Sequence, residues 1–247
     1  MTRFFVDASA IGAEFVTLDA GDAHHLKVVL KASAGDRIAV LDGTGAEITA
    51  ILTDLSKSTA RAKIVARREL ATEASVAITV AQALPKMSDK LEQVLQRGTE
   101  IGVARFWCYE SARSMPHLPA ERHAKRLERC RAIVKTAAEQ AHRAKLPELV
   151  IERMFGDVVQ AAEKYDLALL AYEGERRTTL REALEKASRP VRTVLIVVGP
   201  EGGFSDGEAA DAARAGLTSV SLGGRILRTE TAALVAASQV LYGLDAG

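Results

Sequence analysis

From residue 74 onward the chain alternates between short apolar runs and longer helical patterns, and this alternation limits the folds that it can adopt. The apolar runs predict buried strands at residues 76–84, 103–109, 149–153, 167–172, 194–198 and 219–222. Between them, apolar residues recur every three or four positions, as they do from Leu91 to Ile101 and from Leu127 to Ala137. Strands joined by helical crossovers predict an α/β fold with a mostly parallel sheet and helices on both faces.

Residues 3–69 follow a different pattern, in which short apolar runs are separated by turn residues. Asp42-Gly43-Thr44-Gly45 lies between the runs 37–41 and 48–52 and predicts a hairpin. Residues 58–66 alternate and are rich in strand-forming side chains, so they predict a further strand. We therefore expect a small N-terminal β-barrel over residues 1–72 and an α/β domain over residues 73–247.

The composition excludes several classes of protein. The chain has 247 residues, of which 48% are hydrophobic, so it can bury a core and is neither disordered nor fibrous. It contains no run of signal-peptide or membrane-spanning length, and we expect a cytoplasmic protein without a membrane partner. Cys108 and Cys130 lack metal-ligand spacing, which predicts two buried, reduced thiols.

A glycine-rich loop, Gly199-Pro200-Glu201-Gly202-Gly203, follows the most hydrophobic run and precedes a capping box formed by Ser205 and Glu208. This is the strand end at which open α/β sheets bind ligands. The loop lacks the Lys-Ser/Thr pair of a phosphate loop, and the Glu201 carboxylate would repel phosphates but tolerate a cation such as a sulfonium. The alternative interpretation is a plain glycine turn with a solvated Glu201.

A second loop, residues 222–231, also lies between a predicted strand and a predicted helix. Its apolar residues Ile226 and Leu227 stand between two arginines and would suit a pocket for a flat aromatic base. An alternative, compatible with the first, makes Thr229 the N-cap of the last helix and Glu230 a partner of its dipole.

Basic residues gather in one segment although the net charge of the chain is only +1. Between residues 113 and 145 three acidic residues, Glu121, Glu128 and Glu139, are outnumbered by nine basic ones: Arg113, Arg122, Lys125, Arg126, Arg129, Arg131, Lys135, Arg143 and Lys145. Such a segment can neutralise nucleic-acid phosphates, or it can be a solvated helix face.

A series of motifs runs in order along nearly the whole chain. The motifs are Leu84-Pro85-Lys86, residues 96–102, Ala112-Arg113-Ser114, residues 137–140 with Arg143, residues 170–173, residues 199–203 and residues 222–231. Together they resemble the RsmE-type methyltransferases of the SPOUT class. The resemblance implies methylation of N3 of a uridine in 16S ribosomal RNA, in the small ribosomal subunit, by a homodimer. It also implies an RNA-binding, PUA-like β-barrel and a trefoil-knotted catalytic domain.

The resemblance further implies S-adenosylmethionine as the cofactor, held largely by backbone groups, and no metal. The cofactor residues would be Leu170, Tyr172, Glu173, Gly199, Pro200, Glu201, Gly202, Leu222, Gly223, Ile226, Leu227, Arg228, Thr229 and Thr231. The RNA-binding residues would be His25, Lys31, Lys86, Arg113, Ser114, Arg122, Arg126, Arg129, Gln140 and Arg143. We expect Arg228 to stabilise negative charge on the uracil carbonyl oxygens, and Glu230 to orient the base or accept its proton.

Two other functions are compatible with the sequence. One is a catalytically silent RNA-binding protein of ribosome assembly, which would not bind S-adenosylmethionine. The other is a knotted methyltransferase that acts on transfer RNA or on a ribose 2′-oxygen, which would share the cofactor and differ in the methylated atom.

Overall fold

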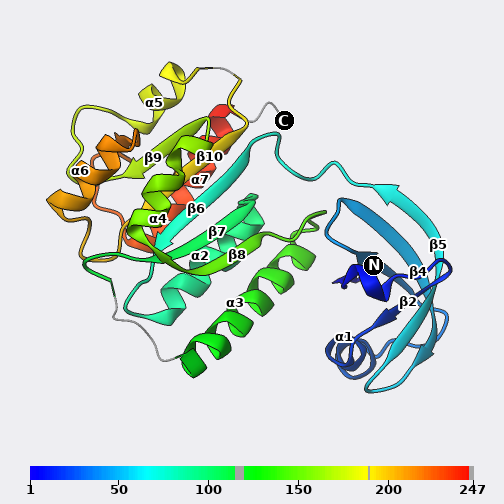
Figure 1. The fold of residues 1–247 in the computed structure, drawn as a ribbon. Coiled ribbons are helices and arrows are strands. Elements are labelled where there is room, and N and C mark those ends of the chain that lie inside the picture. The colour runs from blue at the N-terminus through cyan, green and yellow to red at the C-terminus, as the bar shows by residue number, and fades with distance from the viewer. Residues whose placement is uncertain (115–119, 189, 245–247) are drawn as a thin grey trace. The chain divides into compact units, whose positions relative to one another are not determined.

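The computed structural model describes residues 1–114, 120–188 and 190–244, with residues 120–123 and 152 described by their backbone only. The chain divides into two compact units (Figure 1). Unit 1 comprises Met1–Glu73 together with Ala138–Leu146, and unit 2 comprises Ala74–Ala137 together with Pro147–Gly247.

Unit 1 is built on a curled sheet of five strands in the order β1-β3-β4-β5-β2. The strands are β1 (Arg3–Phe5), β2 (Phe15–Leu18), β3 (Arg37–Leu41), β4 (Ala46–Leu55) and β5 (Ala60–Glu69). Short helical turns join them, namely η1 (Ala8–Ala10), α1 (Ala20–His24) and the π-helical η2 (His25–Val29). Apolar side chains from the strands and from α1 and η2 fill the core of the unit.

The predicted hairpin is confirmed by the antiparallel pairing of β3 with β4. Gly43 and Gly45 adopt φ angles of 80° and 121°, which residues with a side chain rarely adopt, and the turn therefore requires glycine at these positions. The last predicted strand is also confirmed, but β5 continues to Glu69, which pairs with Ala46 of β4. The sheet thus extends to within a few residues of the domain boundary that we expected after residue 72.

Residues 138–146 belong to unit 1 because polar side chains fasten them to its ends. Glu139 accepts a hydrogen bond from the Phe5 backbone N–H at 2.9 Å. Arg143 is buried and forms an ion pair with Glu73, whose carboxylate also accepts from the Ala144 N–H at 3.0 Å. Partial burial of Glu73 disfavours its charge, but Arg143 and the backbone N–H groups outweigh this effect and lower its pKa.

Unit 2 contains a parallel sheet of six strands in the order β11-β9-β10-β6-β7-β8. The strands are β6 (Ala77–Ala83), β7 (Arg105–Glu110), β8 (Glu148–Met154), β9 (Leu167–Ala171), β10 (Thr193–Val198) and β11 (Thr218–Val220). The mixed α/β class and the position of every predicted strand are confirmed.

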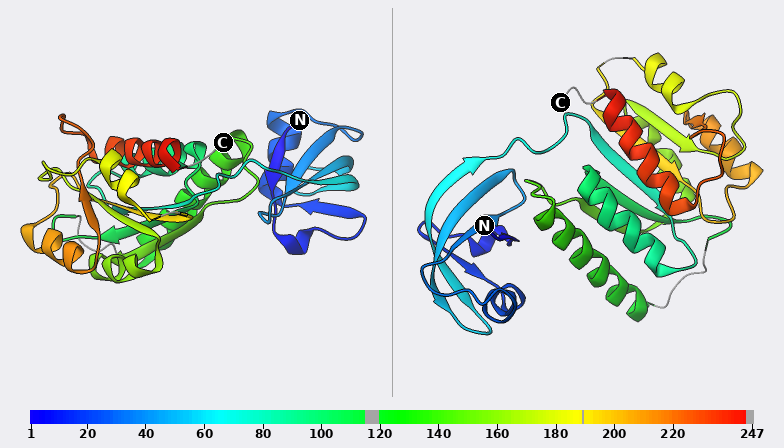
Figure 2. Two further views of the ribbon diagram at one scale, coloured as in Figure 1. Left: turned by 90° about the horizontal axis from the view of Figure 1, so that it is seen from above. Right: turned by 180° about the vertical axis from the view of Figure 1, so that it is seen from behind.

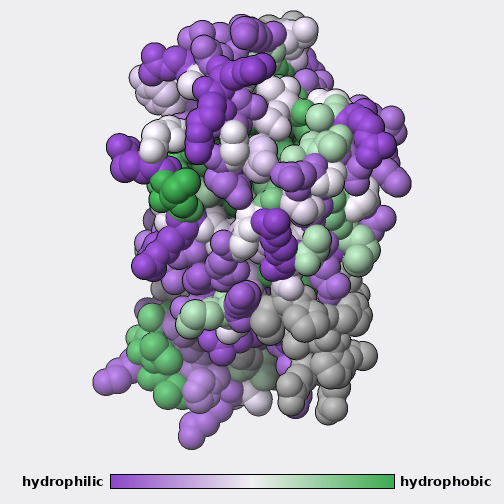
Figure 3. All heavy atoms as spheres, turned by 90° about the vertical axis from the view of Figure 1, so that its left-hand side faces the viewer, coloured by the Kyte–Doolittle hydropathy of each residue, from purple (hydrophilic) through white to green (hydrophobic). Residues whose placement is uncertain are grey.

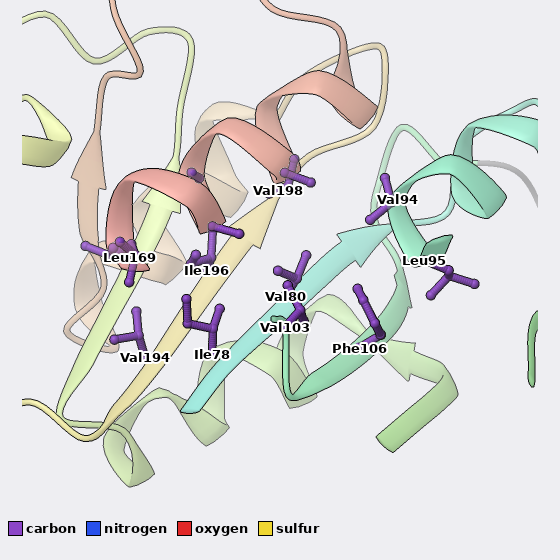
Figure 4. Close-up of a cluster of buried hydrophobic side chains, with 14 of the residues drawn as sticks. Ile78, Val80, Val94, Leu95, Val103, Phe106, Leu169, Val194, Ile196 and Val198 are labelled. Atoms are coloured by element: carbon purple, nitrogen blue, oxygen red, sulfur yellow. The ribbon is translucent and has the colours of Figure 1, made fainter. Parts of the chain in front are cut away.

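Helices cover both faces of this sheet (Figure 2). Side chains of α2 (Ser88–Ile101), α3 (Ala120–Gln140), α5 (Leu180–Lys186) and α7 (Thr229–Leu244) pack on one face. On the other face lie α4 (Phe155–Gln160), η3 (Ala161–Lys164) and α6 (Asp206–Arg214). Figure 4 shows the first core, in which Ile78, Val80 and Ile196 of the central strands face the side of α2 and α7.

Local signals place several helix ends as expected. The Ser205 hydroxyl accepts from the Glu208 N–H at 3.2 Å and the Glu208 carboxylate accepts from the Ser205 N–H at 2.8 Å, which confirms the capping box. Gly216 follows the end of α6 with a φ angle of 86°. A second capping box, formed by Thr179 and Glu182, begins α5 and had not been noticed in the sequence.

Two further expectations concern single residues and the surface. Cys108 and Cys130 are buried and unbonded to each other, as predicted, and burial raises the pKa of both thiols. No helix in the described part of the chain is long and apolar enough to cross a membrane. The face drawn in Figure 3 is mostly hydrophilic, with hydrophobic residues in separate spots.

Candidate active site at the carboxyl ends of the strands

Four neighbouring strands of unit 2 end in one row. Val198 at the end of β10 pairs with Gln82 of β6 and with Ala171 of β9, and Ala171 pairs with Val220 of β11. The strands are parallel, so the loops that follow them lie at the same edge of the sheet. This arrangement brings together the loops of residues 172–175, 199–205 and 221–228.

The glycine-rich loop after β10 is fastened at its start by two hydroxyl groups. The Tyr109 hydroxyl donates to the carbonyl of Val198 at 2.9 Å, and the Thr229 hydroxyl donates to the carbonyl of Gly199 at 2.5 Å. Gln82 donates through Nε2 to the Thr229 oxygen at 2.8 Å. Tyr109, Gln82 and Thr229 are all buried, so water does not compete for these bonds.

Glu201 fastens the same loop to the start of α2. Its carboxylate accepts from the Lys86 backbone N–H at 3.2 Å and from the Lys90 ammonium at 3.0 Å. Partial burial opposes the charge of Glu201, but Lys90 and the Lys86 N–H outweigh it and lower its pKa. We expected the Glu201 carboxylate to tolerate a cationic ligand, and in the structure it forms an ion pair with Lys90.

Arg113 fastens the loop from the side of β7. Its guanidinium donates through Nη1 to the Gly202 carbonyl at 2.8 Å and, more weakly, to the Phe204 carbonyl at 3.4 Å. The preceding residue, Ala112, donates its N–H to Glu208 of α6 at 2.8 Å. Arg113 was expected to contact RNA, and in this structure its guanidinium holds the glycine-rich loop.

The loop after β9 touches the glycine-rich loop directly. A Cβ atom on Gly203 would lie 1.8 Å from Oε1 of Glu173, at the end of an exposed side chain that would have to move aside, and the φ angle of 66° favours glycine at this position. The Tyr172 ring meets the Phe204 ring edge-on, with centroids 6.4 Å apart. Leu170 lies within β9 and is fully buried in the core, so it can contribute only backbone groups to a ligand.

The loop after β11 is the most open of the three. Gly223 has a φ angle of 117°, and no atom lies within 4 Å of a Cβ built there or on Gly224. Ile226 is 78% exposed, and the Arg228 side chain is exposed as well. Of the expected apolar pair, Ile226 is therefore exposed and Leu227 is half-buried.

Thr229 and Glu230 begin α7, and one expectation about them is corrected. Thr229 was expected to be the N-cap, but it is the first helical residue, and its hydroxyl bonds to Gly199 because the glycine-rich loop lies within reach. Glu230 is 7% exposed, and its Oε2 atom has no hydrogen-bond partner among the described residues. Within the described part of the chain, an acceptor is thus left unpaired close to the glycine-rich loop.

The residues expected to bind RNA are distributed over both units. Arg129 forms an ion pair with Glu92 at 2.7 Å, the Arg126 Nε is buried, and the Arg122 side chain lies outside the described residues. In unit 1, His25, Lys31 and Gln140 are exposed, whereas Arg143 is buried against Glu73. The Ser114 hydroxyl donates to the Ser111 carbonyl in the same turn.

Sequence reasoning did not assign Gln82, Lys90 or Tyr109 to the site. Two of them, Gln82 and Tyr109, lie at the ends of strands that border the glycine-rich loop. Gln82 is one of only two polar side chains in the apolar run 76–84, the other being Thr79, and this was the available signal. Lys90 gave no signal, because a lysine in the first turn of a helix is common on a solvated surface.

The sequence was compared with models of known families and with curated proteins. The RNA methyltransferase domain matches residues 72–241, and the RNA methyltransferase PUA domain matches residues 18–65. The chain belongs to the RNA methyltransferase family. Among the relatives of this RNA methyltransferase is ribosomal RNA small subunit methyltransferase E of Synechocystis, 36% identical over 96% of the chain and 76% of the relative. The protein of that name from Bacillus subtilis is 31% identical over 98% of this chain and 96% of the relative.

Solved structures agree with this family. The chain matches a ribosomal RNA small subunit methyltransferase E from Neisseria gonorrhoeae, solved with S-adenosylmethionine, with a TM-score of 0.86 and 30% identity over 98% of this chain and 97% of that one. A protein from Legionella pneumophila, also solved with S-adenosylmethionine, matches with a TM-score of 0.89. The two are 28% identical over 98% of this chain and 97% of that one. The expected enzyme class is therefore confirmed, while the roles of individual site residues stay predictions.

Proposed function

We propose that this RNA methyltransferase transfers a methyl group from S-adenosylmethionine to N3 of a uridine in 16S ribosomal RNA. The proposal rests on family membership, on the names of the relatives, and above all on one feature of unit 2. Its glycine-rich loop is fastened from β6, β7 and α2 at the carboxyl edge of the sheet, beside the exposed Arg228 and the unpaired carboxylate oxygen of Glu230.

The residues at this edge fit the proposed cofactor. Glycines at positions 223 and 224 leave open space beside the backbone, and a flat adenine ring needs such close access to backbone donors and acceptors. The backbone of residues 199–202 and 222–223, with Tyr172 and Glu173 alongside, would hold it. When bound, S-adenosylmethionine supplies a methyl group already activated by a positively charged sulfur.

The target atom determines what the protein itself must do. N3 of uridine is an imide nitrogen and becomes a good nucleophile only when its proton leaves. We assign Glu230 to accept that proton, because one oxygen of its buried carboxylate has no hydrogen-bond partner among the described residues. We assign Arg228 to donate hydrogen bonds to the uracil carbonyl oxygens, on which negative charge develops as the proton leaves.

The remaining parts of the proposal concern RNA binding and assembly. Residues 1–72 would act as the RNA-binding, PUA-like domain and residues 73–247 as the knotted SPOUT domain. The substrate would be the small ribosomal subunit or its RNA, in the cytoplasm. The enzyme would work as a homodimer that packs through the alanine-rich helix α7, and sedimentation at micromolar concentration would test this, since a concentration-independent monomer contradicts it.

Cofactor binding and methyl transfer can be tested separately. Calorimetry should show saturable binding of S-adenosylmethionine to the full chain, and radiolabelled methyl groups should appear in small-subunit RNA. Binding without transfer to any RNA would favour a catalytically silent assembly protein. Absence of cofactor binding would contradict the proposal as a whole.

A further inference from the structure

Gln82 lies at the centre of a buried polar row that links three segments of unit 2. Its Nε2 atom donates to the Thr229 hydroxyl oxygen at 2.8 Å and to the Ala83 carbonyl at 3.0 Å. The Thr229 hydroxyl lies 2.5 Å from the Gly199 carbonyl oxygen. The row thus runs from the end of β6 through the first residue of α7 to the first residue of the glycine-rich loop.

The chemistry of the groups gives this row a single direction. The carbonyls of Ala83 and Gly199 can only accept, so the Gln82 nitrogen must face Ala83, and the Thr229 proton must point to Gly199. A flipped Gln82 amide would place its oxygen against the Ala83 carbonyl oxygen. The Gln82 N–H group occupies the lone pair of the Thr229 oxygen that faces β6. Gln82 therefore orients the Thr229 hydroxyl so that it donates to Gly199.

Stability alone does not explain a glutamine at this position. Gln82 is 1% exposed, and its Oε1 atom is buried without a hydrogen-bond partner among the described residues. Leaving an acceptor in this state costs about 1–3 kcal/mol, a cost that a leucine of similar size avoids. A polar side chain kept at such a cost next to a ligand-binding loop indicates a role in the site.

We propose that Gln82 is a positioning residue of the cofactor site. It acts through Thr229 and holds the Gly199 carbonyl, and with it the start of the glycine-rich loop, in the conformation that receives the cofactor. Gln82 itself touches neither cofactor nor RNA. This inference rests on the function proposed above, which assigns the loop to S-adenosylmethionine.

The test compares variants of the full chain that remove one member of the row at a time. Gln82→Leu removes the donor, Thr229→Val removes the hydroxyl, and Thr229→Ser keeps it. The matched control is Thr79→Val, which lies on the same strand, is 2% exposed and loses the hydrogen bond from the Tyr165 hydroxyl. Titration with S-adenosylmethionine and single-turnover methylation are measured on each variant.

Loss of one hydrogen bond that holds the loop should raise the Kd for S-adenosylmethionine about two- to tenfold in Gln82→Leu and in Thr229→Val. The double variant should be no weaker than the weaker single variant, because both substitutions break the same row. Thr229→Ser, which keeps the hydroxyl, should lose less affinity than Thr229→Val, and Thr79→Val should bind like the wild type. Turnover at saturating cofactor should change far less than KM, since Gln82 does not touch the reacting atoms.

A second measurement is independent of cofactor binding. The Gly203 N–H donates to the Pro200 carbonyl at 3.0 Å, and its hydrogen exchange in the free protein reports how well the loop is held. Exchange should accelerate about two- to tenfold in Gln82→Leu and stay unchanged in Thr79→Val. Wild-type exchange and affinity in Gln82→Leu would overturn the inference. If the wild-type protein itself does not bind S-adenosylmethionine, the proposed function fails, and exchange still decides whether Gln82 holds the loop.

Discussion

At the scale of single residues, the site depends on side chains that hold backbone rather than on side chains that face a ligand. Arg113, Glu201 and Thr229 each bond to, or lie within, the loop of residues 199–204. Arg228 is different, because its side chain is exposed beside the glycine-rich loop and is proposed to act on the target base. Substitutions should therefore separate residues that shape the cofactor site from the residue that acts on the target base.

Arg228→Lys keeps the positive charge but loses the planar, multidentate donor. If Arg228 stabilises charge on the uracil oxygens, turnover should fall roughly ten- to a thousandfold, the order seen when one transition-state donor is removed, while the cofactor Kd changes far less. Single-turnover methylation and calorimetry measure the two effects. The neighbouring exposed Arg225→Lys serves as the control. An equal loss of cofactor affinity and of kcat/KM would make Arg228 a cofactor residue instead.

Gly203→Ala should weaken cofactor binding. The new Cβ would push the exposed Glu173 side chain aside, and the φ angle of 66° would strain the glycine-rich loop. Gly216→Ala is the matched control, because Gly216 has a φ angle of 86° but open space around it. It should cost about 1 kcal/mol of stability without changing the Kd for S-adenosylmethionine. Equal binding by both variants would show that the two loops need not be in contact.

At the scale of elements, one buried ion pair helps to hold the segment 138–146 in unit 1. Arg143 of the segment 138–146 contacts Glu73, which lies just after β5, and the Arg143 side chain is almost fully buried. Breaking a mostly buried, hydrogen-bonded charge pair is more costly than breaking an exposed one. The pair should therefore contribute to stability, although Arg143 was expected to bind RNA.

Glu73→Gln should lower the free energy of unfolding by about 2 kcal/mol at neutral pH. The pKa of Glu73 is lowered in the folded state, so its contribution is present above its usual pKa of 4.5 and is lost as the pH falls through the lowered value. Urea unfolding of both proteins at neutral and acidic pH measures the difference. The exposed pair Arg105–Glu148 provides the control, and Glu148→Gln should cost less than about 1 kcal/mol. A pH-independent difference between Glu73→Gln and the wild type would contradict this account.

Elements specified by local patterns could be predicted from the sequence. The apolar run 194–198 became β10, and Ser205 with Glu208 began α6 where the capping box predicted. Elements that depend on distant partners could not be predicted. Residues 138–146 look like the end of a helix and join unit 1 through residues such as Phe5 and Glu73, which lie far away in the sequence.

The same distinction applies to the candidate site. The loops of residues 199–203 and 222–231 were found because their glycines and flanking strands are local signals. The partners of those loops were not found, because Gln82 and Lys90 come from segments that only the fold brings close. Thr229 was assigned to the correct helix end with the wrong role, since its hydroxyl bonds to a residue 30 positions away.

At the scale of the whole molecule, RNA binding should depend on the exposed basic residues of α3. Arg129 is paired with Glu92, but Lys125 and Arg131 are exposed and available to phosphates. The affinity for RNA should fall steeply with salt, and replacing Lys125 and Arg131 by Ala should lower the slope of log K against log salt by roughly 1–2. Arg181→Ala, on α5, is the control. An unchanged slope would mean that α3 is only a solvated helix face.

The central claim is that the enzyme methylates N3 of one uridine in 16S ribosomal RNA. Mass-spectrometric mapping of ribosomal RNA from cells with and without the gene, and of RNA methylated by the purified enzyme, identifies the nucleotide and the atom together. We predict one methyl group on N3 of a single uridine, absent from the deletion strain and restored by the purified enzyme with S-adenosylmethionine. Methylation of a ribose 2′-oxygen or of transfer RNA, or unchanged 16S RNA in the deletion strain, would contradict the claim.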